Sequence, residues 1–123
     1  MAEKTVLVVD DEASLRLLMQ ATLGRGAYRV LEATNGAAGL ELARRERPDL
    51  VILDVGMPDL DGYTVCRALK GDPETAGMAV VMLTARAQEG DRQRGVEAGA
   101  DAYITKPFSP RALLETVERM LGS

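Results

Sequence analysis

LVILD, residues 50–54, is the stretch that decides the fold: four large apolar residues in a row, closed by a carboxylate. A continuous apolar run with β-branched members is typical of a strand that is covered on both faces, as in a parallel sheet. Gly56 and Pro58 follow and prevent a helix from starting at once. Because ligands of open parallel sheets bind outside the carboxyl ends of the strands, Asp54 is the first candidate for a functional residue.

Four further strands are predicted around this run. Residues 5–9 and 79–83 are also continuous apolar runs, whereas 28–33 and 102–105 are less regular or shorter. The intervening segments predict five helices, which begin at Ser14, after the cap Asn35, after the cap Asp61, at Asp91 and after the cap Ser109. Five such strand–helix units predict an α/β protein with one parallel sheet, helices on both of its faces, and a single domain over residues 1–123.

Two predictions concern side-chain burial. In the first helix, Leu15, Leu18, Met19 and Thr22 have the spacing of a stripe that packs on the sheet. Cys66 lies on the apolar stripe of the third helix and is predicted to be a small core residue rather than a reactive thiol.

The composition narrows the class of protein. A net charge of −4 argues against a nucleic-acid-binding surface. One cysteine and no histidine exclude an internal disulfide and histidine-based catalysis, and they fit a reducing compartment. We find neither a signal peptide nor an apolar run near the roughly 18 residues of a membrane span. The sequence therefore predicts a cytoplasmic protein without direct contact to nucleic acid or membrane.

Polar side chains follow four of the five predicted strands. Asp10 and Asp11 follow the first strand, Asp54 ends the third, Thr84 follows the fourth and Lys106 follows the fifth. Since parallel strands end at one edge of the sheet, these groups are expected to converge. Three neighbouring carboxylates repel one another, so cations must offset them. Lys106 supplies one charge, and an all-oxygen ligand set without His or Cys favours Mg²⁺ for the rest.

This set of groups has what phosphoryl transfer needs. The carboxylate of Asp54 can attack phosphorus while the metal and the Lys106 ammonium neutralise the phosphoryl oxygens. The hydroxyl of Thr84 can then donate a hydrogen bond to the transferred group.

The motifs that follow the strands resemble those of a known family. They are Val8-Val9-Asp10-Asp11-Glu12, Asp54-Val55-Gly56-Met57-Pro58, Asp61-Gly62, Thr84-Ala85 and Tyr103-Ile104-Thr105-Lys106-Pro107-Phe108. In this order and at this spacing, the sequence resembles a response-regulator receiver domain of bacterial two-component signalling, from Val6 to the last helix. The resemblance implies a flavodoxin-like, doubly wound (βα)5 fold with a five-stranded parallel sheet of order 2-1-3-4-5.

The resemblance also implies residue roles at the metal and phosphoryl site. Asp54 corresponds to the phospho-acceptor, and Lys106 to the residue that contacts the phosphoryl group. Asp10 and Asp11, with Asp54 and the backbone carbonyl of Gly56, correspond to the Mg²⁺ ligands.

A conformational switch is implied as well. Thr84 and Tyr103 correspond to the switch pair, and the bond between Lys106 and Pro107 is expected to be cis. Output is expected through the face formed by the fourth helix (91–98), the fifth strand and the fifth helix.

The implied partners are a sensor histidine kinase or a His-phosphotransfer protein, and an unknown downstream effector or fused output domain. Receivers fused to winged-helix DNA-binding domains dimerise through charged pairs, two members of which align here with Ala112 and Thr116. We therefore expect a monomer or a weak dimer.

Two other functions remain open at this point. A Mg²⁺-dependent phosphohydrolase with an aspartyl-phosphate intermediate is the main alternative to a non-enzymatic signalling module. Hydrolases that resemble haloacid dehalogenases carry a second Asp two residues after the nucleophile, where this chain has Gly56. A flavin-binding domain of the same fold would need stacking aromatics, but aromatic residues form only 3 % of the chain. Asp59 and Asp61 are read as a loop residue and a helix cap.

Overall fold

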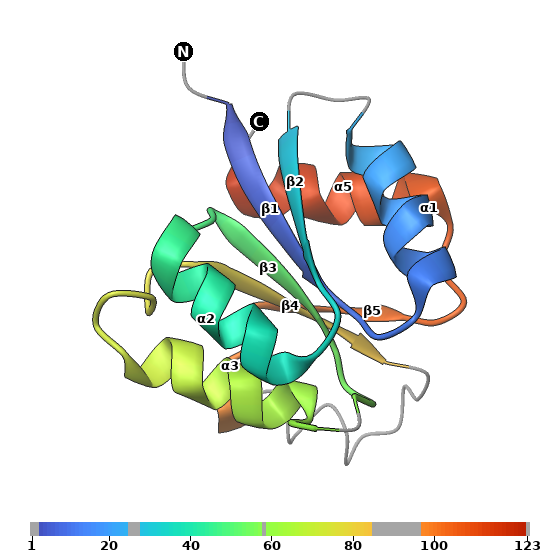
Figure 1. The fold of residues 1–123 in the computed structure, drawn as a ribbon. Helices are drawn as coiled ribbons and strands as arrows, with labels where there is room; N and C mark the ends of the chain where they lie inside the picture. Colours follow the sequence, from blue (N-terminus) through green and yellow to red (C-terminus); the bar gives the residue numbers. More distant parts are fainter. Residues whose placement is uncertain (1–2, 25–27, 58, 85–96, 123) are drawn as a thin grey trace.

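A computed structural model gives the fold (Figure 1) and describes residues 3–24, 28–57, 59–84 and 97–122. The described elements, in chain order, are β1 (Lys4–Val9), α1 (Ala13–Leu23), β2 (Tyr28–Ala33), α2 (Gly36–Glu46), β3 (Leu50–Asp54), α3 (Gly62–Gly71), β4 (Ala79–Thr84), β5 (Ala102–Thr105) and α5 (Pro110–Leu121). The predicted helix at 91–98 lies outside the described residues except for its last two positions.

The five strands form one parallel sheet of order β2-β1-β3-β4-β5. This confirms the predicted α/β fold and its strand order. The central strand β3 is buried along its whole length, as its unbroken apolar sequence predicts. Strands β1 and β3 are neighbours, with Val9 opposite Leu53, so the residues that follow them emerge side by side at one edge.

Helices cover both faces of the sheet, with α2 and α3 on one side and α1 and α5 on the other (Figure 1). Successive strand residues point to opposite faces. In β3, for example, Val51 and Leu53 belong to the core under α2 and α3, whereas Leu50 and Ile52 belong to the core under α1 and α5. Burial on both faces holds the strand ends in fixed positions, which a multi-residue site requires.

All three predicted helix caps are present. The side chains of Asn35, Asp61 and Ser109 accept hydrogen bonds from the third residue of α2, α3 and α5, respectively. Each cap satisfies a backbone N–H that the helix itself leaves without an acceptor. Pro110 follows Ser109 at the start of α5, where a missing N–H costs nothing.

The predicted stripe on α1 is partly wrong. Met19 is buried, but Leu18 is 38 % exposed, and the helix buries Leu23 instead. Leu17 is exposed as well, at 71 %. The buried face of α1 is therefore centred on Met19 and Leu23, and Leu18 lies beside it rather than on it. Cys66 is fully buried, in agreement with its predicted core position.

Within the described residues, no helix combines the length and apolar character that crossing a bilayer requires.

Candidate functional site

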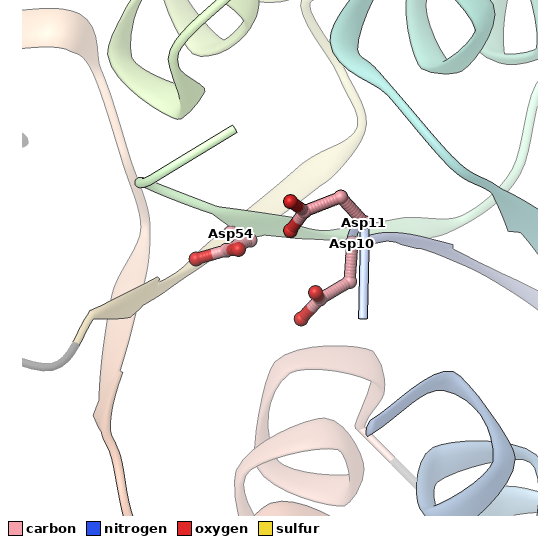
Figure 2. A group of neighbouring side chains, drawn as sticks. All are labelled: Asp10, Asp11 and Asp54. Carbon is pink, nitrogen blue, oxygen red and sulfur yellow. The ribbon is translucent and has the colours of Figure 1, made fainter. Parts of the chain in front are cut away.

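Three carboxylates gather at the edge of the sheet where β1 and β3 end. Asp10, Asp11 and Asp54 each place one carboxylate oxygen within 4.8 Å of the others. Figure 2 shows the three side chains as neighbours. Asp10 and Asp54 are buried, whereas Asp11 is exposed. The register of β1 on β3 explains the cluster, because it brings both strand ends to the same level of the sheet.

Asp10 is held in place at several atoms. Its backbone N–H donates to the carbonyl of Ala33 at 3.1 Å, which continues the pairing of β1 with β2. Its Oδ1 accepts from the backbone N–H of Glu12 at 2.9 Å. Its carbonyl oxygen accepts from the guanidinium of Arg16 at 2.7 Å. The main chain and one carboxylate oxygen are therefore fixed.

The other carboxylate oxygen of Asp10 is buried and has no hydrogen-bond partner among the described residues. The nearest described cation is the Lys106 ammonium, at 3.9 Å from Oδ2. Burial, reinforced by the nearby charge of Asp54, raises the pKa of Asp10 to about 6, although the Glu12 N–H and Lys106 act in the opposite direction. A buried, ionised carboxylate oxygen without a hydrogen bond destabilises the folded protein unless a cation binds it.

Asp54 lies at the centre of a second set of contacts. Its Oδ1 accepts from the Lys106 ammonium at 3.2 Å and from the backbone N–H of Gly56, also at 3.2 Å. Lys106 comes from the end of β5, and its backbone N–H donates to the carbonyl of Thr84 at 2.7 Å. The peptide bond between Lys106 and Pro107 is cis. The lysine thus faces two carboxylates, those of Asp54 and Asp10.

The donor set fits a hard divalent cation. The cluster has three carboxylates, of which the Lys106 ammonium contacts two. The donor atoms are all oxygen, and one buried oxygen is without a hydrogen bond among the described residues. Mg²⁺ binds through one or two carboxylates and keeps several waters, so this small, half-open cluster suits it better than a closed protein cage would. We conclude that the residues present are compatible with Mg²⁺.

Thr84 and Tyr103 lie on neighbouring strands at the same edge. Tyr103 is opposite Met82 in the register of β4 and β5, and Thr84 is two residues beyond Met82. Since side chains alternate along a strand, Thr84 and Tyr103 are on the same face of the sheet. Thr84 is buried, and Tyr103 is partly buried against the core under α2 and α3.

Two residues near the site were not singled out by their sequence pattern. Asp59 does lie in the loop after β3, but its two carboxylate oxygens accept from the N–H groups of Gly36 and Ala37, both at 3.0 Å. These backbone N–H groups lower the pKa of Asp59. The contact spans more than 20 residues, so no local signal identifies it. The second residue is Arg16, whose guanidinium donates to the carbonyl of Asp10, a contact from α1 back to the end of β1 that a helix pattern does not contain.

Comparisons with known proteins agree with this geometry. Residues 6–118 match the family described as the response regulator receiver domain. The chain is 45 % identical over 118 residues to the alkaline phosphatase synthesis transcriptional regulatory protein PhoP of Bacillus subtilis, covering 96 % of this chain and 48 % of that protein. The chain thus spans about half the length of the curated relatives it matches.

Solved structures give the same result. The chemotaxis protein CheY4 of Vibrio cholerae is 34 % identical, with a TM-score of 0.93 over 97 % of this chain and 99 % of that one. The receiver domain of the sensor histidine kinase PA1611 of Pseudomonas aeruginosa is 31 % identical, with a TM-score of 0.90 over 99 % of this chain and 100 % of that one. That structure has a magnesium ion coordinated in its active site cleft.

Proposed function

Because this chain belongs to the response regulator receiver domain family, a family of signalling domains, we propose that it is a phosphorylation-dependent switch that accepts a phosphoryl group on Asp54. The observation that carries the proposal is the position of Asp54. Its carboxylate is 3.2 Å from the Lys106 ammonium and lies within 4.8 Å of the carboxylate oxygens of Asp10 and Asp11. Three carboxylates and an ammonium therefore occupy one edge of the sheet, which supports the proposed roles of nucleophile, cation and metal ligands.

In the proposed transfer, an oxygen of Asp54 forms a bond to phosphorus while the bond from phosphorus to the donor breaks. With a phosphohistidine donor, the electron pair of the broken P–N bond returns to the imidazole of the donor. Oδ1 of Asp54 already accepts hydrogen bonds from Lys106 and Gly56, so Oδ2 is the proposed attacking atom. The Lys106 ammonium stabilises negative charge on the phosphoryl group, a purely electrostatic role that suits a loose transition state.

Asp10, Asp11 and Asp54, together with the backbone carbonyl of Gly56, are the proposed Mg²⁺ ligands. Mg²⁺ bound there would supply positive charge for the carboxylates and for the phosphoryl oxygens. The buried Oδ2 of Asp10, which lacks a hydrogen bond among the described residues, supports this role because a cation would satisfy it.

We propose Thr84 and Tyr103 as the residues that respond to phosphorylation. Their positions on one face of β4 and β5 support this, since a hydroxyl that moves toward the phosphoryl group changes the space next to the aromatic ring. The proposed output face consists of residues 91–98, β5 and α5. Most of its first segment lies outside the described residues.

The proposed upstream partner is a sensor histidine kinase or a His-phosphotransfer protein, and the downstream partner is an effector or a fused output domain. As a free domain, the receiver is proposed to be a monomer or a weak dimer. In support, Thr116 is buried and its hydroxyl donates to the carbonyl of Ala112 at 2.9 Å. Asp101, which also corresponds to a member of those charged pairs, is engaged within the chain by Lys70 and by the N–H of Val80, each at 2.8 Å.

The alternative of a phosphohydrolase is not favoured. The family match points to a signalling domain, and Gly56 replaces the second Asp of the hydrolases considered above. Turnover of a phosphomonoester by this chain would revive that alternative.

Intact-protein mass spectrometry after incubation with acetyl phosphate and MgCl2 tests the proposal. The wild-type chain should gain one phosphoryl group, and Asp54→Asn should gain none. Asp72→Asn makes the same chemical change at the C-terminal end of α3, away from the cluster, and should label like wild type. Labelling of Asp54→Asn at the wild-type rate would refute the assignment of the acceptor.

A further inference from the structure

Arg16 reaches from α1 to the end of β1, where the acidic cluster begins. Its side chain is only 16 % exposed. One end of its guanidinium donates to the carbonyl oxygen of Asp10 at 2.7 Å, and its Nε lies 3.4 Å from the carboxylate of Glu32 on β2. Arg16 therefore joins three elements, α1, β1 and β2, at the residue that bears the buried carboxylate.

The position of Arg16 within α1 does not explain why an arginine is found there. α1 begins at Ala13, so Arg16 lies at the fourth helical position, near the positive end of the helix dipole. A basic side chain is unfavourable there. The N-cap residue Glu12 makes no side-chain capping hydrogen bond, so capping at the start of α1 does not explain the arginine either. The reason for Arg16 is to be sought in its tertiary contacts.

The charge of Arg16 is largely neutralised by its partner. Because Glu32 lies at ion-pair distance, the pair as a whole adds little net field at the metal site. What remains is geometry. The guanidinium is a rigid fork that contacts two acceptors at once, which a flexible ammonium does less well. Its charge-assisted bond to a backbone carbonyl is short and directional.

We propose that Arg16 is a positioning residue for the Mg²⁺ site. By holding the carbonyl of Asp10, it fixes the backbone from which the buried Oδ2 is presented to the cluster. The N–H groups of Asp10 and Glu12 hold two other points of the same unit. This inference rests on the proposed function, because it assumes that Asp10 ligates Mg²⁺. Arg16 itself touches neither the metal nor the phosphoryl group.

The test is a titration of the metal-free protein with MgCl2, followed by amide chemical shifts in NMR, for wild type, Arg16→Met and Arg16→Lys. Met keeps much of the apolar stem of arginine and removes the contacts. Outer-shell partners of metal ligands typically affect affinity by 10–100-fold. Since Mg²⁺ keeps much of its water, we expect about a 10-fold weaker Kd for Arg16→Met, at the lower end of that range.

Arg29→Met is the matched control. It removes the same charge and another ion pair of β2, that with Glu46 at 3.3 Å, without touching Asp10. Loss of a positive charge alone strengthens Mg²⁺ binding, so a charge effect and a positioning effect have opposite signs. We expect Arg29→Met to bind Mg²⁺ at least as tightly as wild type.

A second readout needs no metal. In the metal-free Arg16→Met protein, the amide proton of Glu12, which donates to Oδ1 of Asp10, should exchange faster with solvent than in wild type. Unchanged exchange together with unchanged Kd would overturn the inference.

Arg16→Lys keeps the positive charge and loses the planar guanidinium that contacts two acceptors at once. This variant tests the proposal if Arg16→Met does not fold. We expect weakened Mg²⁺ binding. Wild-type affinity in this variant would show that a positive charge suffices and would overturn the inference. If the wild-type protein itself showed no Mg²⁺-dependent shifts around Asp10 and Asp54, the proposed metal site would fail, which is a distinct result.

Discussion

Replacing Asp10 with Asn should stabilise the metal-free protein at neutral pH. Asp10 is fully buried, one of its carboxylate oxygens has no hydrogen bond among the described residues, and its pKa is raised from 3.8 to about 6. At about 1.4 kcal/mol per pKa unit, the difference between 3.8 and about 6 corresponds to about 3 kcal/mol against the folded state once the group is ionised. Asn is nearly isosteric and carries no charge, so the variant avoids this cost.

The stability difference between Asp10→Asn and wild type depends on pH in a defined way. Below about pH 4 the carboxyl is protonated in the folded and in the unfolded chain, and the cost is absent. Between about 4 and 6 the unfolded chain releases the proton first, so the contribution of Asp10 to stability falls as pH rises. Above about 6 the cost is complete. The stability difference between Asp10→Asn and wild type should therefore grow from near zero at low pH to about 3 kcal/mol at pH 7.5.

Urea unfolding followed by circular dichroism in EDTA, at pH 4 and pH 7.5, measures this difference. MgCl2 should narrow it, since a ligand at ten times its Kd stabilises the wild-type chain by about 1.4 kcal/mol and the Asn variant by less. Asp11→Asn is the control, because Asp11 is exposed and its neutralisation should change stability less. If Asp10→Asn were no more stable than wild type at pH 7.5 in EDTA, the buried carboxylate would not carry the cost assigned to it.

Two further predictions concern α3 and its contacts. A Cβ at Gly62 would lie 2.6 Å from the carbonyl oxygen of Asp54, so Gly62→Ala should lower the free energy of unfolding by about 1–3 kcal/mol in urea titrations. Gly71→Ala, at the open end of the same helix, should raise it by up to about 1 kcal/mol. Equal effects of the two substitutions would contradict the steric argument. Burial raises the pKa of the Cys66 thiol to about 11, and its Sγ lies 3.4 Å from the carbonyl oxygen of Ala98. At pH 8 the thiol should therefore react with a disulfide reagent only after the protein unfolds. Rapid reaction of the native protein would contradict this prediction.

Much of the fold follows from the sequence alone, for a physical reason. The run at 50–53 has no polar position, so a strand buries it well only if it is covered on both faces. Local caps at Asn35, Asp61 and Ser109 likewise depend on contacts three residues away. Information of this kind lies within a few residues of chain, and the structure agrees with it.

The gathering of Asp10, Asp11 and Asp54 was expected from the rule that parallel strands end at one edge. That rule needs only the strand assignments and the parallel direction, both of which the sequence contains. The roles of these residues in phosphoryl transfer and metal binding stay proposals.

Only the tertiary structure decided how the cluster is supported. The exposure of Leu18 depends on which face of α1 packs against the sheet. Asp59 caps α2 across 22 and 23 residues of sequence, and Arg16 joins the Asp10 carbonyl to β2. The Oδ2 of Asp10, which has no hydrogen bond within the described part of the chain, is also a tertiary result, since burial by several elements removes water from a charge. Contacts between distant segments leave no periodic signal in the chain, because each depends on how the elements pack rather than on which elements form.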